Sequence, residues 1–257
     1  MDIIKGLTLF DIHTPDENKP AIKAVELLFS DFKPDYLIWG GDLGNWASFC
    51  HWEEGWASPN QTCDDFESVD KIITRHIGIC GNECKYVWLQ GNHDLWVDNY
   101  CKLAVNEKHL KEYDLKKRLF LKDRKIKFIP INKTFNIGKL KFIHGLYCNE
   151  HHAKKTLLAY NSNVIYGHIH TEQSYTYVSP VDDTQVRVGR SRPCLCNLNP
   201  DYLKNRPNAW THGFSAWYVR EDGTFNEYCV NITKGIFTFN GKTYDGNERR
   251  LETPENA

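Results

Sequence analysis

Short apolar runs that stop at glycine recur through the first two thirds of the chain, and they constrain the fold more than any other feature. Tyr36–Trp39 and Tyr86–Leu89 are two such runs. Runs this short and this apolar are typical of parallel strands buried on both faces. Ile3–Phe10 is also rich in β-formers, and after it apolar residues recur at helical spacings over Ala24–Phe32. The alternation of strand and helix predicts an α/β fold.

The pattern changes in the last third of the chain. From about residue 173 apolar and polar residues alternate, which predicts antiparallel strands and hairpins. The alternating stretches are residues 174–178, 184–190, 214–219 and 225–230. Upstream of them, a charged helix is expected over Asn99–Arg118, followed by short strands near residues 128–131, 139–143 and 164–166.

One domain is the simplest organisation. The 257 residues can bury a sizeable core, and no repeat, linker or low-complexity segment divides them. We expect a single domain over residues 1–244, in which 46–84 form an insertion or lid beside the strand ends and 173–244 a β-rich C-terminal part. Residues 245–257 are rich in charge without apolar periodicity, which predicts a flexible tail.

Charge and cysteine content exclude several classes of protein. The 32 basic and 33 acidic side chains give a formal charge of -1, so no global basic field drives nucleic-acid binding, although a local patch stays open. No run approaches the roughly 18 apolar residues of a membrane span, and the first residues match neither a signal nor a transit peptide. Nine cysteines, an odd number, indicate free thiols in a reducing compartment. We expect a cytoplasmic protein without a membrane partner.

Side chains that bind metals or catalyse proton transfer follow the predicted strands. The ends of five strands carry them: Asp11 and His13; Asp42; Asn92, His93 and Asp94; His144; His168 and His170. The carboxyl ends of strands in an α/β sheet meet at one edge, where loops converge on a rigid support. The sequence therefore predicts one site built from distant segments.

The order of these motifs resembles that of a known family. Asp-x-His, Gly-Asp, Gly-Asn-His-Asp, His-Gly and Gly-His-x-His, over roughly residues 3–171, resemble the calcineurin-like metallophosphoesterase superfamily. The resemblance implies a two- or four-layer β-sandwich flanked by helices, with two metal ions at the strand ends. It also implies that Asp11, His13 and His170 bind one ion, that Asn92, His144 and His168 bind the other, and that Asp42 bridges both.

The donor types narrow the choice of metal. Three oxygen donors and four imidazoles without a thiolate suit Mn, Fe, Zn or Ni rather than Ca or an iron–sulfur cluster, and we expect two divalent ions, with Mn favoured. Two such ions about 3.5 to 4 Å apart lower the pKa of a shared water, so that hydroxide can attack phosphorus in line. By the same resemblance, His93 is not a ligand but touches phosphate and protonates the leaving oxygen. Asp94 is expected to orient His93 or to cap the helix that follows.

The departures from the family pattern bear on the substrate. Protein phosphatases of the superfamily carry an arginine soon after Gly-Asp, whereas Asp42 is followed here by Leu43-Gly44-Asn45-Trp46. This favours the phosphodiesterase and exonuclease branches, and the Ser191–Phe214 region weakly resembles small phage and bacterial members. Nucleotides or nucleic acid are the expected substrates. The predicted substrate contacts are Asn45, Trp46, Arg190, Arg192, Arg206 and His212, with Trp52 and Trp56 as further candidates for base stacking.

Alternatives remain open for every part of this interpretation. Each motif alone could be a turn or a helix cap, the tryptophans could be packing residues, and the arginines a solvated basic loop. Cys50, Cys63, Cys80 and Cys84 could bind a separate zinc ion, although only the last two are close in sequence; Cys194 and Cys196 are expected to be structural thiols. The alternative functions are a phosphomonoesterase, on nucleotides or proteins, and a non-hydrolytic module that binds phosphate or nucleic acid. The oligomeric state stays open.

Overall fold

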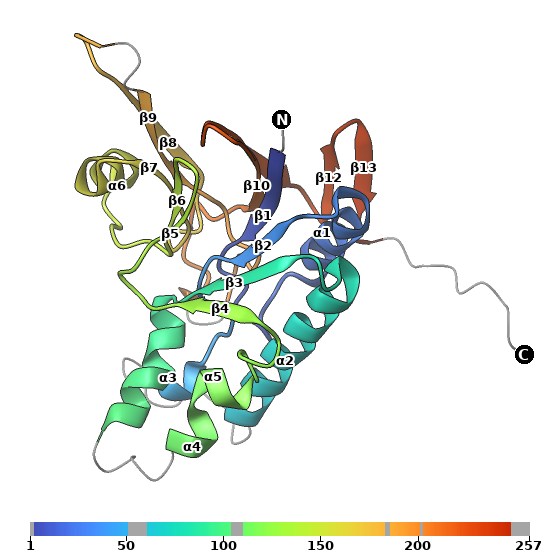
Figure 1. Ribbon diagram of the computed structural model, residues 1–257. Coiled ribbons are helices and arrows are strands. Elements are labelled where there is room, and N and C mark those ends of the chain that lie inside the picture. The colour runs from blue at the N-terminus through green and yellow to red at the C-terminus, as the bar shows by residue number, and fades with distance from the viewer. Residues whose placement is uncertain (1–2, 51–60, 104–109, 183–185, 201–202, 248–257) are drawn as a thin grey trace, which may run out of the picture.

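The computed structural model consists of two β-sheets packed face to face, with helices outside them (Figure 1). It describes residues 3–50, 61–103, 110–182, 186–200 and 203–247. In this part of the chain, no helix is both long and apolar enough to cross a membrane.

The first sheet has the strand order β11-β10-β1-β2-β3-β4, and its β1 to β4 are mutually parallel. The bounds are β1 Ile3–Leu9, β2 Tyr36–Trp39, β3 Lys85–Leu89, β4 Ile126–Ile129, β10 His212–Arg220 and β11 Phe225–Ile232. β10 runs antiparallel to both β1 and β11. The last third of the chain therefore extends the sheet that the N-terminal strands begin.

The second sheet has the order β5-β6-β7-β9-β8. Its strands are β5 Phe135–Ile137, β6 Leu140–Phe142, β7 Asn163–Tyr166, β8 Gln173–Val178 and β9 Val186–Ser191. β9 pairs antiparallel with β8, as the alternation predicts, and parallel with β7. A separate hairpin of β12 (Ile236–Phe239) and β13 (Lys242–Asp245) comes last. The predicted tail therefore begins too early: Asp245 belongs to a strand, and the amide of Gly246 and the side chain of Asn247 donate to Gly235 O and Lys234 O. Residues 248–257 lie outside the described residues.

The alternation of side chains along each parallel strand explains the layers. Leu37 and Trp39 of β2 pack into the core between the first sheet and its helices, while Ile38 between them packs into the core between the two sheets. Successive side chains of a strand point to opposite faces, so a strand that is apolar throughout must be covered on both sides. The result is a β-sandwich flanked by helices, as the resemblance implies.

The helices differ more from expectation than the strands do. They are α1 Lys19–Phe32, α2 Gln61–Cys80, α3 Asn92–Lys102, α4 Leu110–Tyr113, α5 Leu115–Arg118 and α6 His152–Tyr160, with a 3-10 turn, η1, at Ala47–Phe49. The single helix predicted over residues 99–118 is wrong: α3 begins seven residues earlier, and two short helices follow it. α2, within the predicted insertion, buries Phe66, Val69 and Ile73 in the main core, while residues 51–60 lie outside the described part.

Candidate active site

The predicted ligands lie at the carboxyl ends of parallel strands in both sheets. Asp11 and His13 follow β1, Asp42 follows β2, and Asn92 opens α3 after β3; His144 follows β6, and His168 and His170 follow β7. Parallel pairing of β1, β2 and β3, and of β6 and β7, brings these ends to the same edge of each sheet. The sandwich then places the two edges together.

Most of these residues adopt a backbone conformation that is unusual for a side-chain-bearing residue. φ is positive at Asp11 (52°), His13 (50°), Asp42 (50°), His168 (73°) and His170 (62°). Non-glycine residues seldom occupy this region, and they persist there when the surrounding structure holds them, often at functional sites. Two of the hydrogen bonds that hold them join the first two loops: the amide of Asp11 donates to Gly41 O (3.2 Å) and that of His13 to Asp42 O (2.9 Å).

One group of donors gathers around Asp11. Nε2 of His170 lies 3.5 Å from Oδ1 of Asp11 and 3.3 Å from Nε2 of His13. His13 Nε2 is also 3.8 Å from Oδ2 of Asp42. Two imidazole nitrogens and a carboxylate that face one another in this way can share a cation.

A second group of donors also includes Asp42. Nε2 of His144 is 3.0 Å from Oδ1 of Asn92 and 3.3 Å from Oδ2 of Asp42. A donor atom of His168 lies within 4.8 Å of donor atoms of His144 and Asp42. The same carboxylate oxygen of Asp42 therefore faces both groups, as a bridging ligand would.

The burial of these side chains tests whether metal ions fit. Asp11 has no exposed surface, and its Oδ1 accepts no hydrogen bond from any described residue. A buried carboxylate oxygen without a donor is costly, and a cation coordinated there would remove the cost. The donor set of imidazoles, carboxylates and one amide fits two divalent ions of the first transition series or zinc.

Charge within the site alters the acidity of its groups. Burial alone would lower the pKa of His144, but the carboxylates of Asp42 and Asp11 outweigh it and raise that pKa to about 10. Burial would also lower the pKa of His170, which Asp11 raises above its usual value. For His13 and His168 burial prevails, and their pKa values fall. At neutral pH the metal-free site thus carries a proton on His144.

Metal binding is expected to release protons. A metal ion needs the lone pair that the proton occupies, so affinity should rise about tenfold per pH unit for each proton displaced, up to the pKa of about 10 at His144. Calorimetric titration with Mn²⁺ or Zn²⁺ at pH 7, in two buffers of different ionisation enthalpy, should report the release of at least one proton. Binding enthalpies that are independent of buffer would contradict this release of protons.

The raised pKa of His144 also affects the stability of the metal-free protein. Its contribution is fully present below pH 6.5, the usual pKa of histidine, and is lost as pH rises through about 10.

Gly91 allows α3 to approach the Asp42 carboxylate. A Cβ atom at this position would lie 2.0 Å from Oδ1 and 2.4 Å from the backbone nitrogen of Asp42. We expect Gly91→Ala to displace the Asp42 carboxylate, to cost about 1–3 kcal/mol of stability by overpacking, and to weaken metal binding in the same titrations. Gly78→Ala is the control, because nothing lies within 4 Å of its added Cβ and alanine is the better helix former. Unchanged metal binding in Gly91→Ala would refute the close contact.

His93 lies at the edge of the donor groups. Its backbone amide donates to Oδ1 of Asp42 (2.8 Å), and its Nδ1 is 2.7 Å from Asn45 O. A carbonyl can only accept, so Nδ1 carries hydrogen, and Nε2 is the atom left to exchange a proton. The ring packs against Trp96 of α3, with 3.8 Å between the ring centroids and an angle of 33° between the ring planes. The sequence analysis did not single out Trp96, although its position three residues after His93 predicts a shared helix face.

Asp94 serves the backbone rather than the His93 ring. Its carboxylate accepts hydrogen bonds from the amides of Asp42 (3.0 Å) and Gly91 (2.9 Å) and from the indoles of Trp46 (2.9 Å) and Trp88 (3.0 Å). Burial and the nearby carboxylate of Asp42 raise its pKa to about 6. Of the two predicted roles, the capping contact at the start of α3 is present, and no described hydrogen bond joins Asp94 to His93. Asp94 ties the Asp42 loop to α3.

The predicted substrate contacts fare unevenly. Trp46 is fully buried against Asp94, so it offers no surface for a base, and this prediction is wrong. Arg192 is also buried, and both its guanidinium and that of Arg190 bind Glu227 of β11. The two guanidinium groups that were predicted to bind phosphate therefore bind the Glu227 carboxylate instead. Arg206 is exposed, and Asn45 is half-buried with its side-chain amide donating to Asp16 (2.6 Å).

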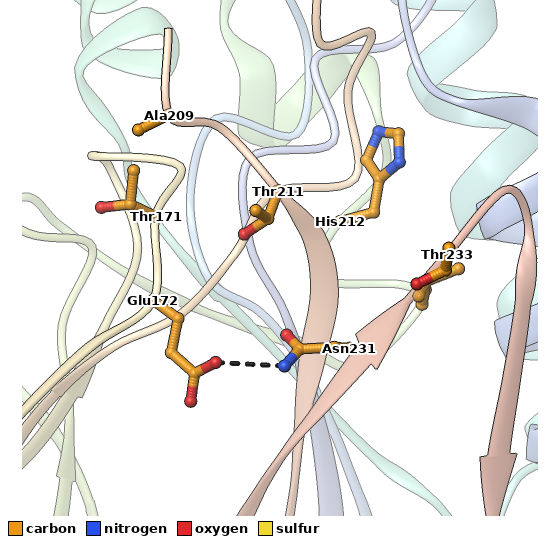
Figure 2. Close-up of a pocket in the computed structure, with 8 residues that line it drawn as sticks. Thr171, Glu172, Ala209, Thr211, His212, Asn231 and Thr233 are labelled. Atoms are coloured by element: carbon orange, nitrogen blue, oxygen red, sulfur yellow. Dashed lines mark hydrogen bonds between the residues drawn. The ribbon is translucent and has the colours of Figure 1, made fainter.

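His212, the last predicted contact, is buried and lines a cavity of about 310 Å³. Thr171, next to His170, and Thr211, whose amide donates to His170 O (3.0 Å), belong to the same wall. Figure 2 shows Glu172 and Asn231 among the lining side chains, and a 3.1 Å hydrogen bond joins them. The cavity therefore adjoins the segment that holds His170, and its lining includes both polar and apolar residues.

The alternative zinc site does not form among the described residues. The groups of three or more potential ligands found there all contain His13 or Asp42. Cys80 and Cys84 contact each other, whereas Cys63 is exposed on α2. Two other cysteines, by contrast, touch the candidate site: Cys148 Sγ lies 3.3 Å from Nε2 of His168, and Cys196 Sγ lies 3.8 Å from Nδ1 of His170. No sequence motif connects these cysteines to the histidines.

Comparison with known proteins gives structural likeness without sequence likeness. No family model matches the chain, and no curated protein matches it. Among solved structures, Vps29 from Entamoeba histolytica complexed with Zn²⁺ is 10% identical, with 95% of this chain and 100% of that chain covered and a TM-score of 0.48. The nuclease MPE from Pseudomonas putida is 13% identical over 88% and 86% of the two chains, at a TM-score of 0.38.

YfcE, a phosphoesterase from E. coli, is 16% identical, with 89% of this chain and 100% of that chain covered and a TM-score of 0.36. At such identities and TM-scores, these likenesses carry no conclusion about activity. The arrangement of the chain's own side chains carries the functional conclusions instead.

Proposed function

We propose that the chain is a two-metal phosphoester hydrolase, most readily a phosphodiesterase that acts on nucleotides or nucleic acid. The single observation that carries the proposal is the Asp42 carboxylate, whose Oδ2 lies 3.8 Å from Nε2 of His13 and 3.3 Å from Nε2 of His144. The unpartnered Oδ1 of buried Asp11 supports it. The ligands assigned to the two ions are those that the resemblance implies.

The residues around the site divide the work of the reaction. Two divalent ions, when bound there, would neutralise charge on phosphoryl oxygens and make a water acidic enough to attack phosphorus. Asn45 O keeps Nδ1–H of His93 fixed, so Nε2 is the atom placed to give a proton to the leaving oxygen. This donation requires the doubly protonated ring, a form that burial disfavours by lowering the pKa of His93. The Asp94 carboxylate accepts four N–H hydrogen bonds and so fixes the Asp42 loop, which preorganises the bridging carboxylate.

Charge favours a diester over a monoester. A phosphodiester carries one negative charge and a monoester close to two at neutral pH, so the monoester needs more cationic partners. Arg190 and Arg192, two of the three arginines predicted to meet phosphate, are paired with Glu227. This leaves the metal ions as the main source of positive charge. His93 favours an enzyme over a binding module, because a binder needs no proton donor.

Hydrolysis of two synthetic substrates tests the proposal. The protein would be stripped of metal, reloaded with Mn²⁺, Ni²⁺, Zn²⁺ or Mg²⁺, and assayed on bis-p-nitrophenyl phosphate and p-nitrophenyl phosphate. Metal-dependent turnover of the diester is the expected result. Turnover of the monoester alone would favour the phosphatase, and two bound ions without any turnover would favour the binding module.

A further inference from the structure

A sulfur atom lies against the outer nitrogen of His170. On its inner side, Nε2 of the ring faces Asp11 Oδ1 at 3.5 Å and His13 Nε2 at 3.3 Å. On its outer side, Nδ1 lies 3.8 Å from Sγ of Cys196. The ring therefore spans from the donor group to a thiol.

Other imidazoles of the site show what an outer nitrogen usually contacts. Nδ1 of His144 lies 3.0 Å from Gly40 O, and Nδ1 of His93 lies 2.7 Å from Asn45 O. Such a contact fixes the tautomer and the angle of the ring, and its loss typically costs about 10- to 100-fold in metal affinity. For His170 a thiol occupies the place that a backbone carbonyl takes in these two.

The main chain on both sides of the thiol is anchored, so the sulfur has a defined position. The amide of Leu195 donates to Asp11 O (3.1 Å), and Nε2 of His212 donates to Cys196 O (2.7 Å). Cys196 itself is 4% exposed. Cys148, beside His168, is exposed and lacks this support.

The inner side of the ring independently indicates a ligand. Asp11 is fully buried, and its unpartnered Oδ1 points to the same Nε2 that His13 approaches. Donor atoms of His13, His170 and Cys196 also lie within 4.8 Å of one another. The thiol thus belongs to the surroundings of the candidate ion rather than to a separate cluster.

We propose that Cys196 is a positioning residue of the metal centre, whose sulfur accepts the Nδ1–H of His170 and so directs the lone pair of Nε2 toward Asp11 and His13. This role rests on the proposed function insofar as His170 binds metal. It assigns to the site a residue that the sequence analysis took for a structural thiol. It also makes one of the two ions, the one bound by Asp11, His13 and His170, depend on a sulfur.

Three variants test the role, and metal affinity without substrate is the measurement. Cys196→Ala removes the acceptor, Cys196→Ser replaces it with an oxygen acceptor, and Cys101→Ala is a control in which an equally buried thiol of α3 is removed. Melting of each metal-free variant would establish that it folds. Chelator competition with Zn²⁺ and Co²⁺, and nitrogen NMR of the histidine rings, would follow.

We expect Cys196→Ala to lower the binding affinity for one of the two ions by about 10- to 100-fold and to change the ratio of His170 tautomers. Cys196→Ser should recover most of the affinity, and Cys101→Ala should match the wild type. Equal losses in the alanine and serine variants would reduce Cys196 to packing, and wild-type affinity in Cys196→Ala would end the proposal. A sulfur-to-cobalt charge-transfer band that disappears in Cys196→Ser would overturn it in favour of direct coordination. A wild-type chain that binds no divalent ion would instead overturn the metal centre itself.

Discussion

Asp42→Asn should lose both metal ions together and, with them, the hydrolysis of phosphodiesters. The substitution keeps the shape of the side chain but removes the charge that both His13 and His144 face. Removing one partner from a buried charge pair costs about 3–5 kcal/mol, which corresponds to about a hundred- to a few thousandfold in affinity. Metal content per chain after dialysis, and diester turnover at saturating Mn²⁺, would measure the effect.

Asp31→Asn provides the matched control for this prediction. Asp31, on α1, is a carboxylate exposed to solvent whose described partners are Lys242 and Tyr244 rather than any proposed ligand. Exposed pairs of this kind contribute little to stability, so this variant should keep both ions and full turnover. If Asp42→Asn retained two ions at wild-type affinity and a normal rate, Asp42 would not bridge them.

His93→Ala should keep both ions and lose most turnover. The bond from position 93 to Asp42 comes from the backbone amide, so the substitution leaves it in place. The loss of a general acid typically costs about 10²- to 10⁴-fold in rate. Metal content and the rate of hydrolysis would be measured on the same preparation, because the prediction separates the two.

The leaving group supplies the control for His93. p-Nitrophenolate departs without a proton, whereas an alkoxide leaving group such as that of a nucleoside needs one. The variant should therefore lose more activity on a dinucleotide than on bis-p-nitrophenyl phosphate. Equal losses on both substrates would remove the proton-donor role, and the loss of metal along with activity would make His93 a structural residue.

Much of the fold could be predicted because its causes lie in neighbouring residues. The apolar runs of β2 and β3 require cover on both faces, and that requirement alone implies a sheet between two layers. The helix predicted over residues 99–118 failed for a tertiary reason. α3 begins at Asn92 because Gly91 and Asp94 cap it there. The Asp94 carboxylate also accepts a hydrogen bond from the Asp42 amide, so this cap depends on packing between distant segments.

The candidate ligands could be predicted from the order of the motifs along the chain, whereas the substrate contacts could not. The ligands depend on where strands end, and Gly-Asp or Gly-His marks those ends in the sequence. Arg190 and Arg192 were predicted to contact phosphate because nothing near them in the sequence indicates a carboxylate partner. Their partner, Glu227, lies 35 or more positions away on β11. Trp46 was likewise predicted to stack on a base because its burial, which depends on α2 and Asp94, is not visible in the local sequence.

By itself the sequence determined the alternation of buried strands and helices, the strand ends where the site lies, and the kinds of donor atom that gather there. These follow from short-range periodicity and from glycines that stop strands. The tertiary structure alone decided which carboxylate neutralises which arginine, that Asp94 serves the backbone, and that Cys196 touches His170. Each of these pairs joins different loops or strands, and the partner of a buried polar group is chosen by packing across the fold, which no local pattern encodes.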